Sequence, residues 1–201
     1  MDIQTVAKNL QKRRFLAETF ETAADAVARL LEIAGTGSVG VSGSASVKEA
    51  GAFEALAAHG NAVYCHTFVP QAEKAAMRHA AIAADVYLCS ANAVTEDGVI
   101  VNIDGTGNRV AATLYGPETV VMLVGKNKLV PSVEAGILRT KRECCPKNAR
   151  RLGVATPCAA TGACADCVTP ARMCNATVLL EYPTRNVKAF YVLLVNEQLG
   201  W

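Results

Sequence analysis

Four cysteines lie close together near the end of the chain, at Cys158, Cys164, Cys167 and Cys174. Their spacing is C-x5-C-x2-C-x6-C, and the two residues inside the central Cys-Ala-Asp-Cys pair allow both thiolates to turn onto one metal ion. Four thiolates with no histidine nearby suit tetrahedral zinc and a [4Fe-4S] cluster equally well. The spacing therefore predicts a metal site with these four cysteines as its ligands.

Other uses of these thiols stay open at this level. Cys164 and Cys167 are also spaced as a redox-active or disulfide pair, and four unrelated thiols are the remaining alternative. The spacing matches neither the ferredoxin run nor the paired motifs of a zinc ribbon, so it does not identify the metal. Cys144 and Cys145 are candidates for a substitute ligand or a regulatory thiol.

The segment GVSGSASVKEAG, residues 40–51, has the composition of a strand, a glycine- and serine-rich loop and the start of a helix. Free backbone amides and the positive end of a helix attract anions at such a junction. It is neither a P-loop nor the dinucleotide-binding fingerprint. We expect Ser42, Gly43, Ser44 and Ser46 to surround a phosphate or carboxylate; the alternative is an ordinary turn with a serine cap.

The segment NIDGTGNRVA, residues 102–111, repeats this design. Its arginine offers a planar fork for a carboxylate or phosphate, although an ion pair between Arg109 and Asp104 is an equally good interpretation. The predicted ligand-binding residues in this segment are Asp104, Gly105, Gly107, Asn108 and Arg109.

Two titratable residues are candidates for catalysis. Glu96 is a possible nucleophile or base, although Glu-Asp-Gly usually forms a solvated turn. His66 directly follows a predicted strand and is a possible acid or base, with a simple loop histidine as the alternative. No arrangement of serine, histidine and aspartate indicates a catalytic triad.

These loops need a scaffold, and the pattern of apolar residues predicts one. Short apolar runs alternate with helical segments, which indicates an α/β fold with a mostly parallel sheet and helices on both faces. Residues 1–36 are predicted as an N-terminal helical arm, followed by an α/β domain over residues 37–201. A cysteine-rich loop, 144–174, is predicted to interrupt that domain before a C-terminal hairpin. The expected strands are 38–43, 62–65, 85–90, 98–103 and 119–125, and the expected helices are 2–34 (in two pieces), 46–59, 70–83, 107–116 and 132–143.

In open α/β sheets, ligands bind beyond the carboxyl ends of the strands. Both glycine-rich loops fall at such ends, and so do the segments 66–70 and 90–98. We therefore expect four polar loops to converge on one cleft.

Composition narrows the class of protein. Of the 201 residues, 51% are hydrophobic and only 5% aromatic, so the core must consist mainly of alanine, valine and leucine. The formal net charge of +2 and the lack of a basic block with interleaved aromatics give no indication of nucleic-acid binding. No signal peptide or membrane-spanning run is recognisable. We expect a cytoplasmic protein, in which eight cysteines are unlikely disulfide partners because the compartment is reducing.

Several segments together resemble the lactate-utilization (LUD) domain family, and most closely its short, single-domain, cysteine-containing members. They are VGVSGSASVKEAG, the long run from SANAVTEDG through DGTGNR to GKNKLV, NARRLGVATPCAATGACADC, and LLVNEQLG. The resemblance covers nearly the whole chain. It implies a fold like that of ribose-phosphate isomerase, glucosamine-phosphate deaminase and CoA transferases. Family members similar to lactate utilization protein C work beside iron–sulfur partner proteins in oxidising lactate to pyruvate.

Three functional hypotheses follow. The first is an accessory or redox subunit of organic-acid utilization, which binds a small anionic metabolite at the glycine loops and a metal or cluster at the cysteines. The second is a stand-alone isomerase- or transferase-like enzyme acting on a phosphorylated or CoA-linked substrate, and the third is a ligand-binding domain without chemistry. Possible partners are iron–sulfur redox proteins and a second copy of the chain, since a helical arm outside the core pattern often packs on another subunit.

Overall fold

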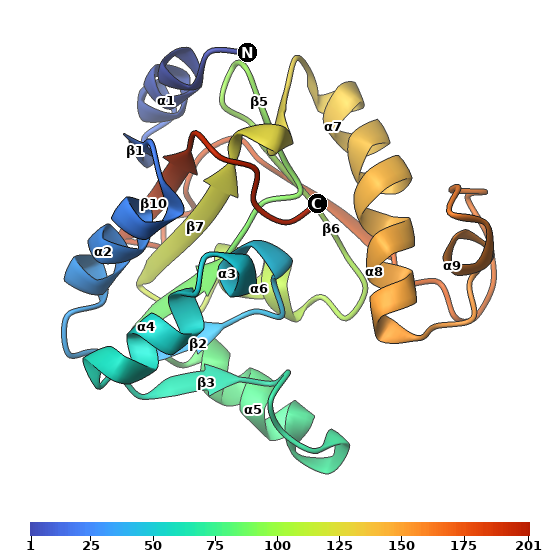
Figure 1. Ribbon diagram of the computed structural model, residues 1–201, viewed down its shortest axis with the longest axis horizontal. Coiled ribbons are helices and arrows are strands. Elements are labelled where there is room, and N and C mark those ends of the chain that lie inside the picture. Colours follow the sequence, from blue (N-terminus) through green and yellow to red (C-terminus); the bar gives the residue numbers. More distant parts are fainter.

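A computed structural model describes all residues, 1–201. Its centre is a sheet of six parallel strands in the order β1-β10-β7-β4-β2-β3 (Figure 1). This architecture confirms the predicted α/β class with a mostly parallel sheet. The strands are β1 (Leu16–Phe20), β2 (Val39–Val41), β3 (Val63–Cys65), β4 (Val86–Cys89), β7 (Thr119–Gly125) and β10 (Ala189–Val195).

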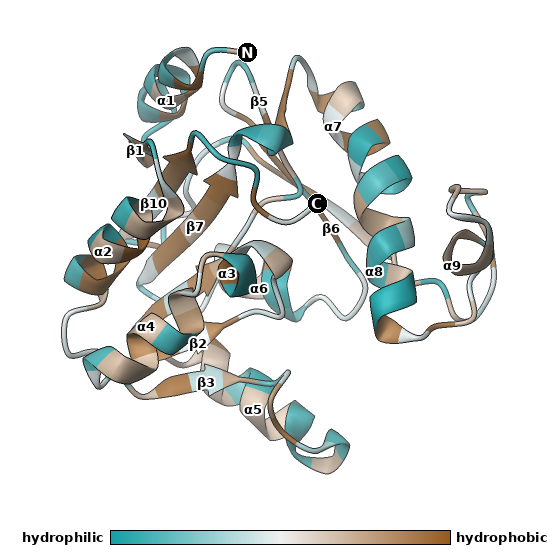
Figure 2. Ribbon diagram, viewed as in Figure 1, coloured by the Kyte–Doolittle hydropathy of each residue, from teal (hydrophilic) through white to brown (hydrophobic).

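The middle strands of this sheet are continuous apolar runs because both of their faces are covered. β7 reads TVVMLVG and is buried from its second residue onward, and β10 reads AFYVLLV. Figure 2 shows these strands as strongly hydrophobic elements of the interior, whereas hydrophilic and hydrophobic residues alternate along the helices.

Helices cover the two faces of the sheet. One face packs against α2 (Ala23–Ala34), α3 (Ala45–Glu49) and α4 (Ala52–His59) in a core that includes Leu30 and Leu56. The opposite face packs against α1 (Ile3–Lys12), α5 (Lys74–Ile82) and α6 (Asn108–Leu114). A short 3₁₀ turn, η1 (Gln71–Glu73), leads into α5.

A second, smaller sheet completes this opposite face. Its order is β8-β5-β6-β9, and β5–β6 and β6–β9 are antiparallel. Ile100 and Leu180 belong to the same core as the large sheet, and α7 packs on the other side. The elements are β5 (Ala93–Thr95), β6 (Ile100–Asp104), β8 (Leu129–Val130), β9 (Ala176–Leu180), α7 (Val133–Arg139) and the 3₁₀ segment η2 (Lys126–Lys128).

The predicted cysteine-rich loop is partly helical. α7 continues through a π-helical segment, η3 (Thr140–Cys144), into α8 (Cys145–Leu152), and a short helix α9 (Pro157–Thr161) follows. Figure 1 shows α7 and α8 as one long rod beside the sheets, with α9 beyond it. The expected start of a loop at residue 144 is therefore wrong, because Cys144 and Cys145 belong to this rod.

Two further expectations need correction. Residues 16–20 form the edge strand β1, parallel to β10, within the segment expected to be two helices only. The expected C-terminal hairpin is absent, because β9 pairs with β6 while β10 enters the large sheet between β1 and β7.

Residues of α1 such as Val6 and Leu10 lie in the protein's own core, so the packing reason for expecting a homodimer falls away. None of the helices combines the length and apolar character that a transmembrane span requires.

Gly40 in the short strand β2 lies against α5, and its replacement by alanine is expected to destabilise the protein strongly. An added Cβ would lie 1.9 Å from the carbonyl oxygen of Ala81, so α5 would have to move away from the sheet. Overpacking of this kind costs about 1–3 kcal/mol, and more where the obstacle is backbone. Urea unfolding would measure the loss, and an unchanged midpoint would show that α5 does not pack this closely.

Candidate anion-binding cleft

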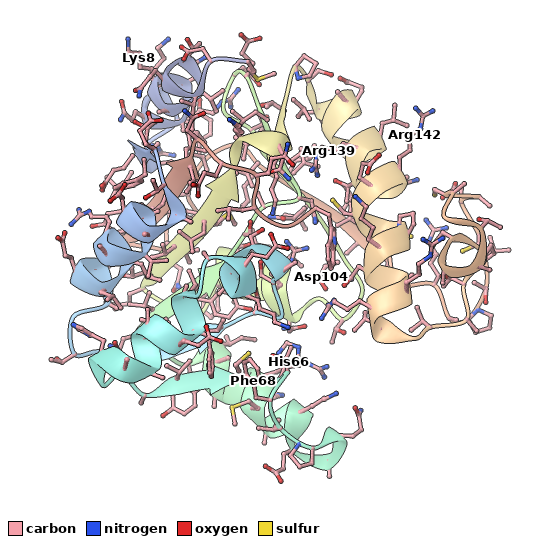
Figure 3. The ribbon with its side chains drawn as sticks, viewed as in Figure 1. Lys8, His66, Phe68, Asp104, Arg139 and Arg142 are labelled. Carbon is pink, nitrogen blue, oxygen red and sulfur yellow. The ribbon has the colours of Figure 1, made fainter.

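A cleft of about 560 Å³ opens at the carboxyl ends of the parallel strands. Ser42 follows β2, His66 follows β3, and Ser90 follows β4; all three line the cleft. The small sheet contributes Asp104 from the end of β6, and α8 forms the opposite wall with Arg151. Figure 3 shows Asp104 and His66 between the strand ends and this wall. All four segments that were predicted to converge contribute residues to this cleft.

The topology explains why the cleft forms here. From β2 the chain crosses to β3 on one side, and from β3 it returns past β2 to β4 on the other side. After β2 the chain enters α3 and α4 on one face of the sheet, and after β4 it enters β5 and β6 on the opposite face, so the loops after β2 and β4 diverge and leave a crevice. Such a switch point is the usual ligand position in open α/β sheets.

Lys128 lies on the floor of this cleft and is only 3% exposed. It follows β7 in the η2 segment, and its Nζ donates to Ser46 Oγ at 2.5 Å, to Ser90 Oγ at 2.9 Å and to the Ala91 carbonyl at 3.0 Å. These partners are all uncharged, and no carboxylate forms an ion pair with this amine.

Burial lowers the pKa of Lys128 to about 7, since an ammonium loses the solvation of water in this interior. The Cys144 thiol opposes this shift, while Arg139 and Arg109 add to it. A buried ammonium that lacks a counter-ion is a strong site for an anion, because an anionic group entering the cleft would supply the missing charge.

Most of the other charged side chains that line the cleft are positive, like Lys128. Six cationic side chains line the cleft against one carboxylate, Asp104, which pairs with Arg109 at 3.4 Å. Arg172 pairs with Asp166 outside the cleft. The four cations left without a carboxylate partner are Lys74, Arg78, Lys128 and Arg151.

Arg109 holds the walls of the cleft together. Its Nη1 donates to the Ser90 carbonyl and to Asn102 Oδ1, and its Nη2 donates to Asn92 Oδ1 at 3.1 Å and to the Ile103 carbonyl at 2.8 Å. With the Asp104 ion pair, the whole guanidinium is engaged before any ligand arrives. A contact between Arg109 and a ligand stays a prediction, and the geometry gives this residue a structural role as well.

Ser42 is 4% exposed, and its hydroxyl has no hydrogen-bond partner in the protein. A second buried polar atom without a partner, Arg78 Nε, belongs to another residue that lines the cleft. Buried polar groups are nearly always satisfied, so two unsatisfied ones at the same cleft point to a ligand or water that would complete them.

The structure separates the predicted site residues into two sets. Glu96 does not line the cleft: it is exposed on the turn between β5 and β6, at the far end of the small sheet from Asp104, because β5 carries the chain away from the strand ends. Gly107 also lies outside the lining, where a positive φ of 89° allows the turn into α6. The predicted residues that do line it are Ser42, Gly43, Ser44, Ser46, His66, Asp104, Gly105, Asn108 and Arg109.

Helix dipoles contribute less than expected from the sequence. α3 has five residues and α6 has seven, so neither begins with a long row of aligned peptide dipoles. The positive charge of the cleft comes instead from Lys128 and the other lining cations.

The π-helical segment places Cys144 in the wall of the cleft, beside Cys145. Arg139 fixes its position: Nη1 donates to Cys144 Sγ at 3.1 Å and to the Asn92 carbonyl at 2.8 Å. Segments of π-helix often mark functional positions. No sequence pattern had indicated this helix type.

The four predicted metal ligands do not line the cleft, although Cys174 lies between the lining residues Met173 and Asn175. All eight cysteines are free, and no group of three or more histidine, cysteine, aspartate or glutamate side chains is arranged to hold a metal ion. Burial raises the pKa of Cys145 to about 12. Four neighbouring thiols add to this shift: Cys174, Cys144, Cys164 and Cys158. Four other thiols therefore act on the charge of Cys145, and thiols are soft donors of the kind that zinc and iron–sulfur clusters use.

The fold defines an α/β protein with a cleft at the carboxyl ends of a parallel sheet, at its topological switch point. The chain belongs to the LUD domain family, whose model matches residues 3–195, and this family is associated with lactate utilization. A solved structure of a DUF162 family protein from Deinococcus radiodurans has the same fold, with a TM-score of 0.57 at 14% identity over 96% of this chain and 95% of that one. A search of the curated proteins gave no significant match.

Proposed function

We propose that the cleft binds the anion of a small organic acid and that the protein is an accessory or redox subunit of lactate-type organic-acid utilization in the cytoplasm. The observation that carries the binding proposal is the buried Lys128, which lacks a carboxylate partner at the floor of a cleft with a large excess of cations. Membership of the LUD family supports the metabolic role.

The floor suits a carboxylate. Around Lys128, the hydroxyls of Ser46 and Ser90 donate to backbone carbonyls and accept from the amine, so both are held rigidly. The Ser42 hydroxyl is free to donate to a ligand oxygen. At about 4 Å, an anionic oxygen would interact with a lysine ammonium by about 4 kcal/mol at the effective dielectric constant of such sites.

The first test is calorimetric titration of the protein with lactate, pyruvate and glycerate. We expect saturable binding of the three acids to one site, with each displacing the others. Glu96→Gln should leave binding unchanged, because Glu96 lies outside the cleft. If none of the three acids binds, the cleft is not an organic-acid site and the proposal is wrong.

We further propose that zinc or a [4Fe-4S] cluster is bound by Cys158, Cys164, Cys167 and Cys174. The segment that carries these four cysteines would then pack against the buried thiol of Cys145. The soft donor set fits either group, and three of the four cysteines, Cys158, Cys164 and Cys174, act on the charge of Cys145. A cluster would supply electron transfer beside the cleft wall and imply iron–sulfur protein partners. Zinc would instead order the segment, since binding and folding are coupled in such sites.

Metal analysis of protein purified without oxygen tests this site. We expect stoichiometric zinc, or iron with acid-labile sulfide and a broad visible absorption band, and loss of the metal in Cys164→Ser and Cys174→Ser. Cys65→Ser is the matched control, because Cys65 lies in β3 away from the segment and should retain the metal. Protein without metal, or metal retained in both cysteine variants, would contradict the assignment.

A further inference from the structure

A second group of cations lies at the outer part of the cleft. Lys74 and Arg78 come from α5 and Arg151 from α8, and all three line the cleft around His66. Unlike Lys128, these side chains are partly or fully open to solvent. None of them forms an ion pair with a carboxylate. We call Lys74, Arg78, Arg151 and His66 the outer basic cluster.

The charged groups that act most strongly on the outer basic cluster differ from those that act most strongly on Lys128. Burial is the largest cause of the lowered pKa of His66. The next causes are the positive charges of Arg78, Lys74 and Arg151, and the Asp104 carboxylate opposes them. The groups that act on Lys128 are instead Cys144, Arg139, Arg109 and Glu49. The two sets share no member. Figure 3 shows the same separation, with His66 and Arg139 on opposite sides of Asp104.

The outer cluster also contains an unsatisfied donor. Arg78 Nε is buried and has no acceptor in the protein. Because a buried donor without a partner is costly, an anionic oxygen at this point would bind with favourable geometry as well as favourable charge. A second unsatisfied group, the Ser42 hydroxyl, also lines the cleft, so two of its hydrogen-bonding groups lack a partner.

We propose that the ligand carries two anionic groups, a carboxylate at Lys128 and a phosphate at the outer basic cluster, so that its class is a phosphorylated hydroxy or keto acid. This inference rests on the proposed function and deepens it. Two arginines and a lysine match the double charge and the several oxygens of a phosphate better than those of a second carboxylate. The cleft volume of about 560 Å³ lies in the range of drug-sized ligand sites, well above what a three-carbon acid fills.

The test compares four probes by calorimetry: phosphoglycerate, which carries both groups, glycerate, glycerol phosphate, and the dicarboxylate malate. Because charge-assisted hydrogen bonds are the strong ones, phosphoglycerate should bind at least about tenfold more tightly than each of the other three. In an NMR titration, phosphoglycerate should also raise the pKa of His66, whereas glycerate should not.

Arg151→Gln is the main variant, because Arg151 is exposed and its loss should not prevent folding. It should weaken phosphoglycerate binding by about tenfold and leave glycerate binding unchanged. Arg78→Gln should do the same. Arg142→Gln is the matched control, since Arg142 lies on the same helical rod, points away from the cleft (Figure 3) and is exposed.

The outcomes separate this inference from the proposed function. If glycerate or malate binds as tightly as phosphoglycerate, or if Arg151→Gln weakens glycerate and phosphoglycerate equally, the phosphate subsite is wrong while the carboxylate site stands. If glycerol phosphate alone binds and no carboxylate contributes, the proposed organic-acid function is wrong. If no probe binds, both are wrong.

Discussion

Lys128→Met is expected to weaken carboxylate binding in the cleft and, at the same time, to stabilise the folded protein. The methionine would keep the length of the side chain and remove the only buried cation of the floor that lacks a carboxylate partner. Losing a charge-assisted contact of about 1.5–3 kcal/mol would weaken glycerate binding by roughly 10- to 100-fold. The same change removes the unfavourable burial of an ammonium.

The gain in stability should depend on pH. In the folded protein the pKa of Lys128 is lowered from 10.5 to about 7, so between these values the unfolded chain binds a proton that the folded chain has released. Stability of the wild type therefore rises with pH across this window and is lowest at and below about pH 7. The advantage of Lys128→Met should be greatest there, on the order of a few kcal/mol at about 1.4 kcal/mol per pKa unit, and should vanish as the pH approaches 10.5.

Urea unfolding of both proteins between about pH 6 and pH 10 would measure this difference. Lys126→Met is the matched control, because Lys126 is exposed two residues away and should change neither binding nor the pH dependence. A Lys128→Met protein that is less stable than the wild type at pH 7, or that binds glycerate normally, would contradict the role given to this lysine.

Arg109→Gln is expected to be the most destabilising substitution in the cleft. The glutamine cannot replace the fork that joins Ser90, Asn92, Asn102 and Ile103, and it leaves Asp104 without its ion pair. Breaking a buried ion pair by removing one partner costs about 3–5 kcal/mol. For a chain of this size, each kcal/mol lowers Tm by roughly 2–4 °C, so a fall of about 10 °C is expected.

Differential scanning calorimetry would measure the Tm of Arg109→Gln and of the control variant Arg29→Gln. Arg29 pairs with Glu18 and Glu32 at the surface, where ion pairs contribute about 0–1 kcal/mol, so its loss should change Tm little. Equal effects of the two substitutions would show that the Arg109 network does not hold the cleft together.

The sequence predicted much of the fold because its main strands are continuous apolar runs. Residues 119–125 match β7 residue for residue, and the glycine-rich loops were recognised as cleft components because their polar residues directly follow such strands. β1 was missed because LAETF is short and mixed in polarity, as an edge strand can be. β10 could not be placed from the sequence either, because its neighbours β1 and β7 are distant in the chain.

The key residue of the site was not predicted. Lys128 lies in GKNKLV, where lysines after a strand usually form a solvated turn. Its burial is produced by Ser46 and Ser90, which come from loops that only the tertiary fold brings together. The one available signal was its position just after a buried strand, at the edge where ligands bind. Glu96 lies outside the cleft because a strand that was not predicted, β5, carries the chain away from that edge.

The crystal structure of the protein with glycerate bound would test the central claim most directly. We predict electron density for the acid inside the cleft, with a carboxylate oxygen within about 4 Å of Lys128 Nζ and a ligand oxygen accepting from the Ser42 hydroxyl. Density for glycerate only outside the cleft, or inside it with the carboxylate turned away from Lys128, would contradict the account.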